Sequence, residues 1–208
     1  MIVSQEAPPK TKANKTDRRR RPGRKVEILQ AVMTLLEKGN DKVTTAALAA
    51  EVGLSEAALY RHFSGKSAIF KALTDYVEEH LLKPAYQLQE GKDSPLQQLN
   101  RLYHYHLLFF AEHPGLCRVF LVEGVVSKEE TQQMIRVVSE YKKRVKKLLS
   151  LGQERQEIST QLDLDAVANL FVGMIQAATL RFVMSGFKHS PVDEIDSSWQ
   201  LFMLAVTE

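Results

Sequence analysis

The chain has 208 residues, a net charge of +3, 44% hydrophobic residues and 25% charged residues, which is typical of a soluble globular protein of one or two domains. Its apolar runs are short and interrupted by charge, so we expect no membrane-spanning helix, and no apolar segment of a secretory signal follows the N-terminus. A single cysteine, Cys117, excludes an intrachain disulfide and fits a reducing compartment. The sequence therefore predicts a cytoplasmic protein.

The basic residues are concentrated at the start of the chain. Residues 1–25 hold nine lysines and arginines against two acidic residues, which leaves the remainder net acidic. Residues 1–22 lack periodicity and contain three prolines, so residues 1–23 are predicted to form a flexible basic arm. One interpretation is a solvated tail; the other is an arm that adds nucleic-acid contacts, as arginine-rich arms do beside other DNA-binding modules.

A helix predicted over 24–38 ends at Gly39, and residues 44–66 then predict two short helices joined by a tight turn. Thr44 and Ser55 are suitable N-caps for the two helices. Gly53 between them takes a left-handed turn without steric cost. This order of cap, turn and new cap is typical of a helix-turn-helix motif.

The second helix of this motif has the chemistry of a DNA reader. Residues 55–58 are short or polar, so their backbone can approach base edges in a major groove. Tyr60, Arg61 and His62 carry donors that can reach phosphate oxygens. Lys66 is expected in the first turn of the next helix, capped by Ser64, where a cation is disfavoured unless a phosphate lies alongside.

The order and spacing of these residues over roughly 25–80 resemble the DNA-binding domain of TetR-type transcriptional regulators. The resemblance implies that Thr44, Thr45, Tyr60, His62 and Lys66 grip phosphates and that residues 55–58 face the bases. It also implies an all-α fold, with a three-helix helix-turn-helix domain over 24–66 and a helical regulatory and dimerisation domain over 67–208. The implied function is that of a regulator, most simply a repressor, which binds a palindromic operator as a dimer. The predicted DNA-binding residues are Arg24, Thr44, Thr45, Ser55, Glu56, Ala57, Ala58, Tyr60, Arg61, His62 and Lys66.

The rest of the chain predicts further helices. One spans 66–82 and ends before Pro84, one begins at Pro95, a short one holds 116–121, and a long one opens at Ser127. The last two are predicted over 163–185 and 192–206, the second capped by Asp193. Their apolar faces are too broad for one small body, and the matching helices of the family pair between protomers as a four-helix bundle. The predicted dimer-interface residues are Leu170, Phe171, Met174, Ala178, Phe182, Trp199 and Phe202.

The resemblance also implies a small-molecule pocket between the helices of 66–152 and the helix over 163–185. Its expected ligand is small and apolar or aromatic, although simple core packing explains the same periodicity. The predicted pocket residues are Tyr103, His106, Phe110, Cys117, Phe120 and Met174.

An enzyme is not expected. No nucleophile triad, paired-carboxylate motif, phosphate-binding glycine loop or His-Glu-x-x-His motif is visible. His104 and His106 are two residues apart on a helix, so they face different ways and cannot share a tetrahedral metal ion. The sequence predicts no metal and no cofactor.

A second, narrower resemblance leaves an alternative open. The segments 55–63 and 181–199 are similar to the nucleoid occlusion factor SlmA, which binds DNA and antagonises the division protein FtsZ. This resemblance implies FtsZ as a partner in place of a small-molecule effector.

Overall fold

The computed structural model describes residues 23–39, 44–87, 93–121 and 128–207, and the regular structure in those ranges is helical throughout. The all-α prediction is confirmed, whereas the predicted basic arm and the capping residue Ser127 lie outside the described residues. The helices are α1 (Arg24–Glu37), α2 (Thr45–Glu51), α3 (Glu56–Tyr60), α4 (Lys66–Val77), the π-helical segment η2 (Glu78–Leu82), α5 (Lys83–Gln87), α6 (Pro95–Glu112), α7 (Pro114–Leu121), α8 (Lys128–Glu154), α9 (Leu164–Met184) and α10 (Ile195–Thr207).

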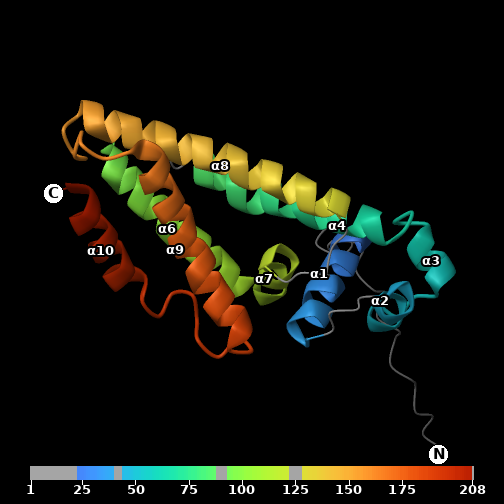
Figure 1. Ribbon diagram of the computed structural model, residues 1–208. Helices are drawn as coiled ribbons and strands as arrows, with labels where there is room; N and C mark the ends of the chain where they lie inside the picture. The colour runs from blue at the N-terminus through green and yellow to red at the C-terminus, as the bar shows by residue number, and fades with distance from the viewer. Residues whose placement is uncertain (1–22, 40–43, 88–92, 122–127, 208) are drawn as a thin grey trace, which may run out of the picture.

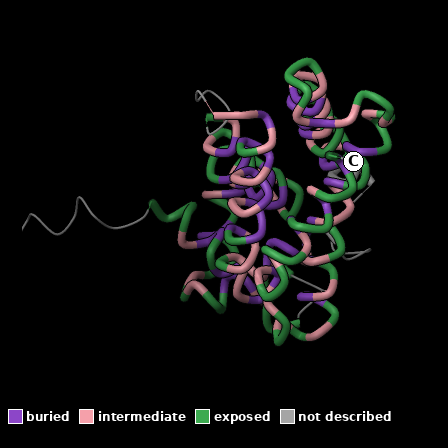
Figure 2. The backbone as a smooth tube through the Cα atoms, turned by 90° about the vertical axis from the view of Figure 1, so that its left-hand side faces the viewer, coloured by how far each residue is buried: buried purple, intermediate pink, exposed green. Residues whose placement is uncertain are grey.

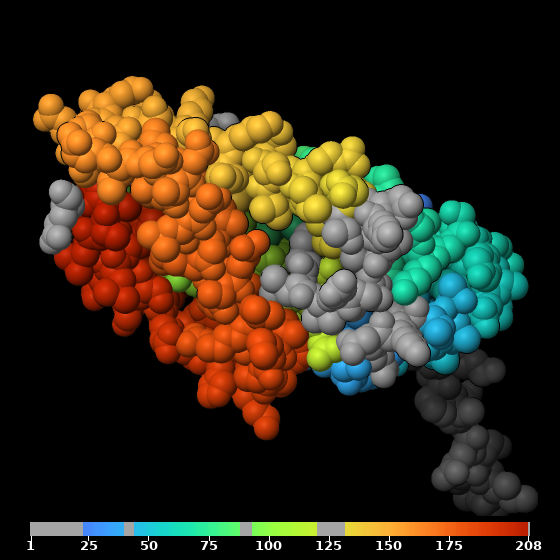
Figure 3. All heavy atoms as spheres, in the orientation of Figure 1, coloured from blue at the N-terminus to red at the C-terminus, as the bar shows by residue number. Residues whose placement is uncertain are grey.

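The molecule is elongated, with α2 and α3 at one end and α10 at the other (Figure 1). We call α1–α3 the head and α6–α10 the body; α4, η2 and α5 connect them. In the body, α8 packs against α6 and α9, and α10 packs on α6 and α9. In the space-filling view, the atoms of the head lie at one end of the long molecule (Figure 3).

One hydrophobic core runs through both parts. It extends from Ile28 of α1 through Leu73 of α4 and Leu99 of α6 to Phe171 of α9 and Phe202 of α10. These side chains are at most 1% exposed, and the buried residues follow the inward sides of the helices (Figure 2). Because the core is continuous, a change of packing in the body can reach the head.

A glycine lets α7 of the body approach α1 of the head closely. Gly115 is the second residue of α7, and a Cβ at this position would lie 2.7 Å from the carbonyl carbon and 2.8 Å from the Cα of Met33 in α1. Only glycine lets the two helix backbones approach this closely. The packing of α7 against α1 therefore depends on the absence of a side chain at position 115.

The connecting helix differs from its prediction. We expected a helix over 66–82 with Pro84 beyond its end, which is wrong, because the helix continues through a π-helical segment into α5. Pro84 has no N–H, so it cannot donate to the carbonyl of His80 four residues earlier. The Tyr105 hydroxyl of α6 donates to that oxygen instead, at 2.9 Å. In η2 the Lys83 N–H donates to the Glu78 carbonyl five residues back, which is the π pattern.

The two C-terminal helices also differ in detail. The chain turns over 191–194, so α10 begins at Ile195 and the predicted start at Val192 with an Asp193 cap is wrong. Within the described residues α9 is long and apolar enough to cross a membrane, contrary to the expectation, but Val167, Phe171 and Ile175 of this helix are buried in the body. The body packing identifies α9 as a core helix.

Four of the residues predicted to form the dimer interface are covered within the chain: Phe171, Phe182, Trp199 and Phe202. The rings of Phe171, Trp199 and Phe202 pack together and against Tyr103 of α6, whereas Phe182 packs against Cys117 and Phe187. Burial within one chain leaves these four rings little surface for a partner. Leu170 is 47% exposed, and Met174 and Ala178 are half-buried. Other large apolar side chains of the same two helices are exposed instead. We define the apolar face of α9 and α10 as Leu170, Leu180, Met184, Leu201 and Leu204.

Candidate functional site

The helix-turn-helix motif is built as the sequence predicts. The Thr44 hydroxyl oxygen accepts the N–H of Ala47 at 3.1 Å, and the Ser55 hydroxyl oxygen accepts the N–H of Ala58 at 3.2 Å. Both side chains therefore cap the helices that follow them. Gly53 has a φ of +63°, which the turn between α2 and α3 requires.

The solvent-facing side of α3 carries Glu56, Ala57, Tyr60 and Arg61. Tyr60 is 50% exposed, a large fraction for an aromatic residue that no neighbouring element covers. Ala58 is only 7% exposed and points into the head, so the prediction that it faces bases is wrong. The exposed side of α3 thus begins with the cap Ser55 and continues through these four residues.

Two other predicted DNA contacts are engaged within the head. The Arg24 guanidinium binds the Glu27 carboxylate and donates to the Val52 carbonyl oxygen at 3.2 Å, which ties the start of α1 to the end of α2. The Thr45 hydroxyl donates to the Glu56 carboxylate at 3.1 Å, which joins α2 to α3. No spacing rule predicts this second contact, because it crosses the turn.

Lys66 is the first residue of α4, as expected, but Gly65 and not Ser64 stands at the N-cap, with a φ of +153° and no side-chain cap. An exposed cation at this helix end is disfavoured by about 0.3–1 kcal/mol, whereas a phosphate is favoured there. The Lys66 ammonium lies 5.2 Å from the centroid of the Phe70 ring. His62, four residues before Lys66, is half-buried, whereas its neighbour Arg61 is exposed and its neighbour Phe63 is buried.

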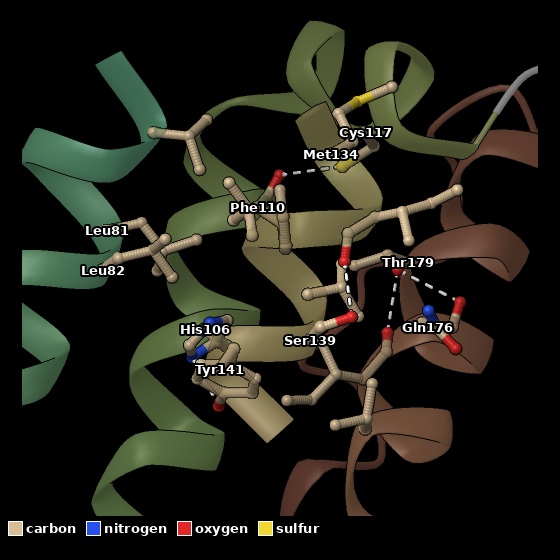
Figure 4. A pocket seen from close by; sticks show the side chains of 16 residues that line it. Leu81, Leu82, His106, Phe110, Cys117, Met134, Ser139, Tyr141, Gln176 and Thr179 are labelled. Carbon is tan, nitrogen blue, oxygen red and sulfur yellow. Dashed lines mark hydrogen bonds between the residues drawn. The ribbon is translucent and has the colours of Figure 1, made fainter. Parts of the chain in front are cut away.

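A cavity of about 350 Å³ opens in the body between α4, η2, α6, α8 and α9 (Figure 4). Three of the predicted pocket residues line it: His106, Phe110 and Cys117. The remaining lining comprises Val77, Leu81, Leu82, Met134, Ile135, Val137, Val138, Ser139, Tyr141, Val172, Ile175, Gln176 and Thr179. None of these described lining residues is acidic, lysine or arginine, so the wall is apolar with a few neutral polar groups.

The principal polar feature of the wall is a pair formed by His106 of α6 and Tyr141 of α8, which Figure 4 shows side by side. The Nδ1 atom of His106 lies 3.0 Å from the Leu102 carbonyl oxygen and 3.2 Å from the Tyr141 hydroxyl. A carbonyl oxygen only accepts, so we assign the imidazole proton to Nδ1. The pair then offers one acceptor, His106 Nε2, and one donor, the Tyr141 hydroxyl.

Burial keeps this pair uncharged. Desolvation lowers the pKa of His106 to about 4, although its hydrogen bond to Leu102 opposes the shift, and it raises the pKa of Tyr141 well above 10. Burial also raises the pKa of the Cys117 thiol to about 12, so that thiol is an apolar wall group and not a nucleophile. A neutral wall without charged side chains favours a neutral ligand.

The other predicted pocket residues lie elsewhere. Tyr103 and Met174 line a separate hollow of about 230 Å³ between α6, α9 and the turn before α10, so their assignment to the cavity is wrong. The side chain of Phe120 lies outside the described residues. Sequence reasoning missed Leu81, Leu82 and Tyr141, although a buried tyrosine hydroxyl on the inward stripe of α8 is a usable signal.

Two further histidines, in α6 and at its C-terminal cap, have separate partners. His104 contacts the Asn100 carbonyl and the Asp196 carboxylate, and His113 contacts the Phe109 carbonyl and the Tyr76 hydroxyl. Within the described ranges, no three histidine, cysteine or acidic side chains gather closely enough to hold a metal ion.

Comparison with known proteins agrees with this arrangement. A sequence model described as "Bacterial regulatory proteins, tetR family" matches residues 28–73, and a "Tetracyclin repressor-like, C-terminal domain" model matches residues 92–186. The nucleoid occlusion factor SlmA of Aliivibrio fischeri (strain MJ11) is 31% identical over 186 residues, which is 88% of this chain and 95% of that protein. SlmA of Shewanella loihica is 32% identical over 180 residues, 85% of this chain and 91% of that protein.

The solved structures show the same fold. The transcriptional regulator FadR of Bacillus subtilis, solved in complex with stearoyl-CoA, has a TM-score of 0.70 at 21% identity, over 86% of this chain and 97% of that one. The matched family models cover both the helix-turn-helix head and most of the body, and the relatives extend over nearly the whole chain. The chain therefore belongs to the TetR family of bacterial regulatory proteins and is a helix-turn-helix DNA-binding regulator.

Proposed function

We propose that the protein is a dimeric repressor whose hold on a palindromic operator is released by a small neutral ligand in the body cavity. The observation that carries this proposal is the position of the cavity. Val77, Leu81 and Leu82 of its wall belong to the connecting helices α4 and η2, and α4 begins at Lys66, directly after the head. A ligand that favours one packing of this wall therefore shifts the population of head orientations relative to the body.

Dimerisation supplies the second helix-turn-helix head that a palindromic operator requires. The apolar face of α9 and α10 exposes Met184 by 78%, Leu201 by 68% and Leu204 by 57%. Exposed large apolar side chains on two neighbouring helices are typical of an interface, and a dimer that pairs these helices brings two α3 helices to two half-sites. As a DNA-binding protein of this family, the protein acts in the cytoplasm on nucleoid DNA.

Selection of bound duplexes from random DNA, followed by gel shift, tests this function directly. We expect enrichment of an inverted repeat with half-sites about one helical turn apart. The absence of duplex binding at low salt for any sequence would refute the proposal.

The neutral character of the cavity gives a prediction with simple probes. Octan-1-ol is expected to raise the melting temperature, whereas octanoate and octylammonium of the same chain length do not, because their charge would be buried without a partner. Tyr141→Phe removes the donor of the wall pair and is expected to weaken octanol binding about fivefold, which corresponds to one net hydrogen bond. Tyr86→Phe is the matched control, because Tyr86 of α5 is not among the residues that line the cavity.

Differential scanning fluorimetry over a concentration series of each probe provides the measurement. Stabilisation by octanoate equal to that by octanol would contradict a neutral ligand class. In the same samples, octanol at saturating concentration is expected to weaken operator binding.

The basic arm is proposed to add phosphate contacts. Deletion of residues 1–22 removes seven lysines and arginines and is expected to reduce the slope of log affinity against log salt by about 0.9 for each phosphate contact that the arm makes. Deletion of residues 1–9, which contain no lysine or arginine, is the matched control. Fluorescence anisotropy with labelled operator at several salt concentrations measures both slopes, and equal slopes would show that the arm is a solvated tail.

A second candidate function rests on the relatives. SlmA proteins of more than 30% identity match both the head and the body of this chain, and their names describe nucleoid occlusion. Under this alternative the DNA-bound dimer contacts the division protein FtsZ, and no small ligand is needed. Co-sedimentation with FtsZ polymers, with and without bound DNA, separates this function from ligand-controlled repression.

A further inference from the structure

Glu56 is an unusual residue for a surface that meets a polyanion. It is the first residue of α3, it is exposed, and Ala57 beside it carries only a methyl group. In the part of the chain that the structure describes, no lysine, arginine or histidine forms an ion pair with the Glu56 carboxylate. The negative charge therefore lies at the start of the exposed side of α3, and no described cation pairs with it.

A neighbouring side chain fixes the direction of this carboxylate. The Thr45 hydroxyl of α2 donates to Glu56 Oε2 at 3.1 Å, across the turn of the motif. The hydroxyl that the family resemblance assigns to a phosphate is thus used within the head. One carboxylate oxygen is held by α2, and the other has no protein donor among the described residues.

The hydrogen-bonding groups on the base edges determine which base the free Glu56 oxygen can bind. A carboxylate only accepts hydrogen bonds, and phosphates repel it, so it is tolerated in a major groove where a base presents an amino group. Cytosine N4 and adenine N6 are those amino groups, but adenine N7 beside N6 is an acceptor that repels a carboxylate. Cytosine is therefore the matching base.

We propose that Glu56 reads a cytosine in each half-site and that Thr45 is the positioning residue that aims its carboxylate. The inference rests on the proposed DNA binding and adds a specificity determinant to it. Ala57, next along the helix, is free to contact a thymine methyl group but carries no donor or acceptor that could replace Glu56.

The test compares the sites that wild-type protein and Glu56→Gln select from random duplexes. Glutamine binds the N6 and N7 atoms of adenine together, so the variant is expected to lose the cytosine preference at one symmetric position by about tenfold and to gain adenine there. Glu37→Gln removes the same charge from the end of α1 without a contact to Thr45, and it is expected to select wild-type sites. Circular dichroism melts verify that each variant is folded.

Thr45 variants test the positioning role. Thr45→Val removes the hydroxyl and is expected to lower the cytosine preference at the same position, whereas Thr45→Ser retains the hydroxyl and the preference. If Thr45 instead grips a phosphate, Thr45→Val weakens all duplexes equally and leaves the preference intact, which overturns the positioning role.

The outcomes distinguish failure of cytosine recognition by Glu56 from failure of the proposed sequence-specific DNA binding. Absence of any selected site for the wild-type protein contradicts sequence-specific DNA binding itself. Selection of one palindrome by both wild-type protein and Glu56→Gln, with the same base preferences, supports DNA binding but overturns cytosine reading by Glu56.

Discussion

Gly115→Ala is expected to destabilise the protein by about 3 kcal/mol or more, the upper end of the range for overpacked interiors. The added Cβ would lie 2.7 Å from the Met33 carbonyl carbon, and the clashing atoms belong to the backbone of α1. No side-chain rotation relieves such a clash, so α7 must move away from α1. For a chain of this size the melting temperature should fall by about 6–12 °C.

Urea unfolding followed by circular dichroism measures this loss. Glu112→Ala, an exposed position three residues earlier at the end of α6, is the control and should stay within about 0.5 kcal/mol of wild type. An unchanged unfolding midpoint for Gly115→Ala would mean that α7 does not rest against the backbone of α1. Because α7 contacts the head, the variant should also bind operator less tightly at temperatures where it remains folded.

Leu180→Glu is expected to convert the dimer into a monomer and to weaken operator binding by about 100-fold or more, since a carboxylate buried without a partner costs several kcal/mol. Leu180 is 41% exposed in one chain, so the substitution leaves the core of the body intact. If the apolar face of α9 and α10 is the dimer interface, each such carboxylate is buried against an apolar surface of the partner. Each protomer then meets its half-site alone and loses the effective concentration that its partner provides.

Leu108→Glu is the matched control, because Leu108 is 50% exposed on α6 and lies outside the apolar face of α9 and α10. Sedimentation velocity gives the mass of each variant, and anisotropy with the selected palindrome gives its affinity. A dimeric Leu180→Glu protein with wild-type affinity would place the interface on another surface.

The head could be predicted from sequence because local interactions determine it. The caps Thr44 and Ser55 and the left-handed Gly53 act over a few residues, and the structure places all three as predicted. Ala58 was misassigned because a small residue on a short helix suits a core and a groove equally well. The contact between Thr45 and Glu56 joins two helices, so the periodicity of either helix does not predict it.

The body could be predicted only in outline, because its site is formed by long-range packing. Periodicity identified His106, Phe110 and Cys117 as inward residues, but Tyr103 is equally inward and lies in another hollow. The same ambiguity affected the interface, since hydrophobicity does not say whether a ring such as Phe171 packs within a chain or between two chains.

The π-helical segment η2 sets the rotation of the head about the long axis of the connecting rod. An α-helix advances about 100° per residue, and a single π turn accommodates an additional residue within one turn. The side chains of α4, which precede η2 on the side of the head, are therefore turned relative to those of α5, which follow it on the side of the body. The angle between the head and the body therefore depends on the number of residues in η2, and a change in length of one residue there would turn the head against the packing of α7 on α1.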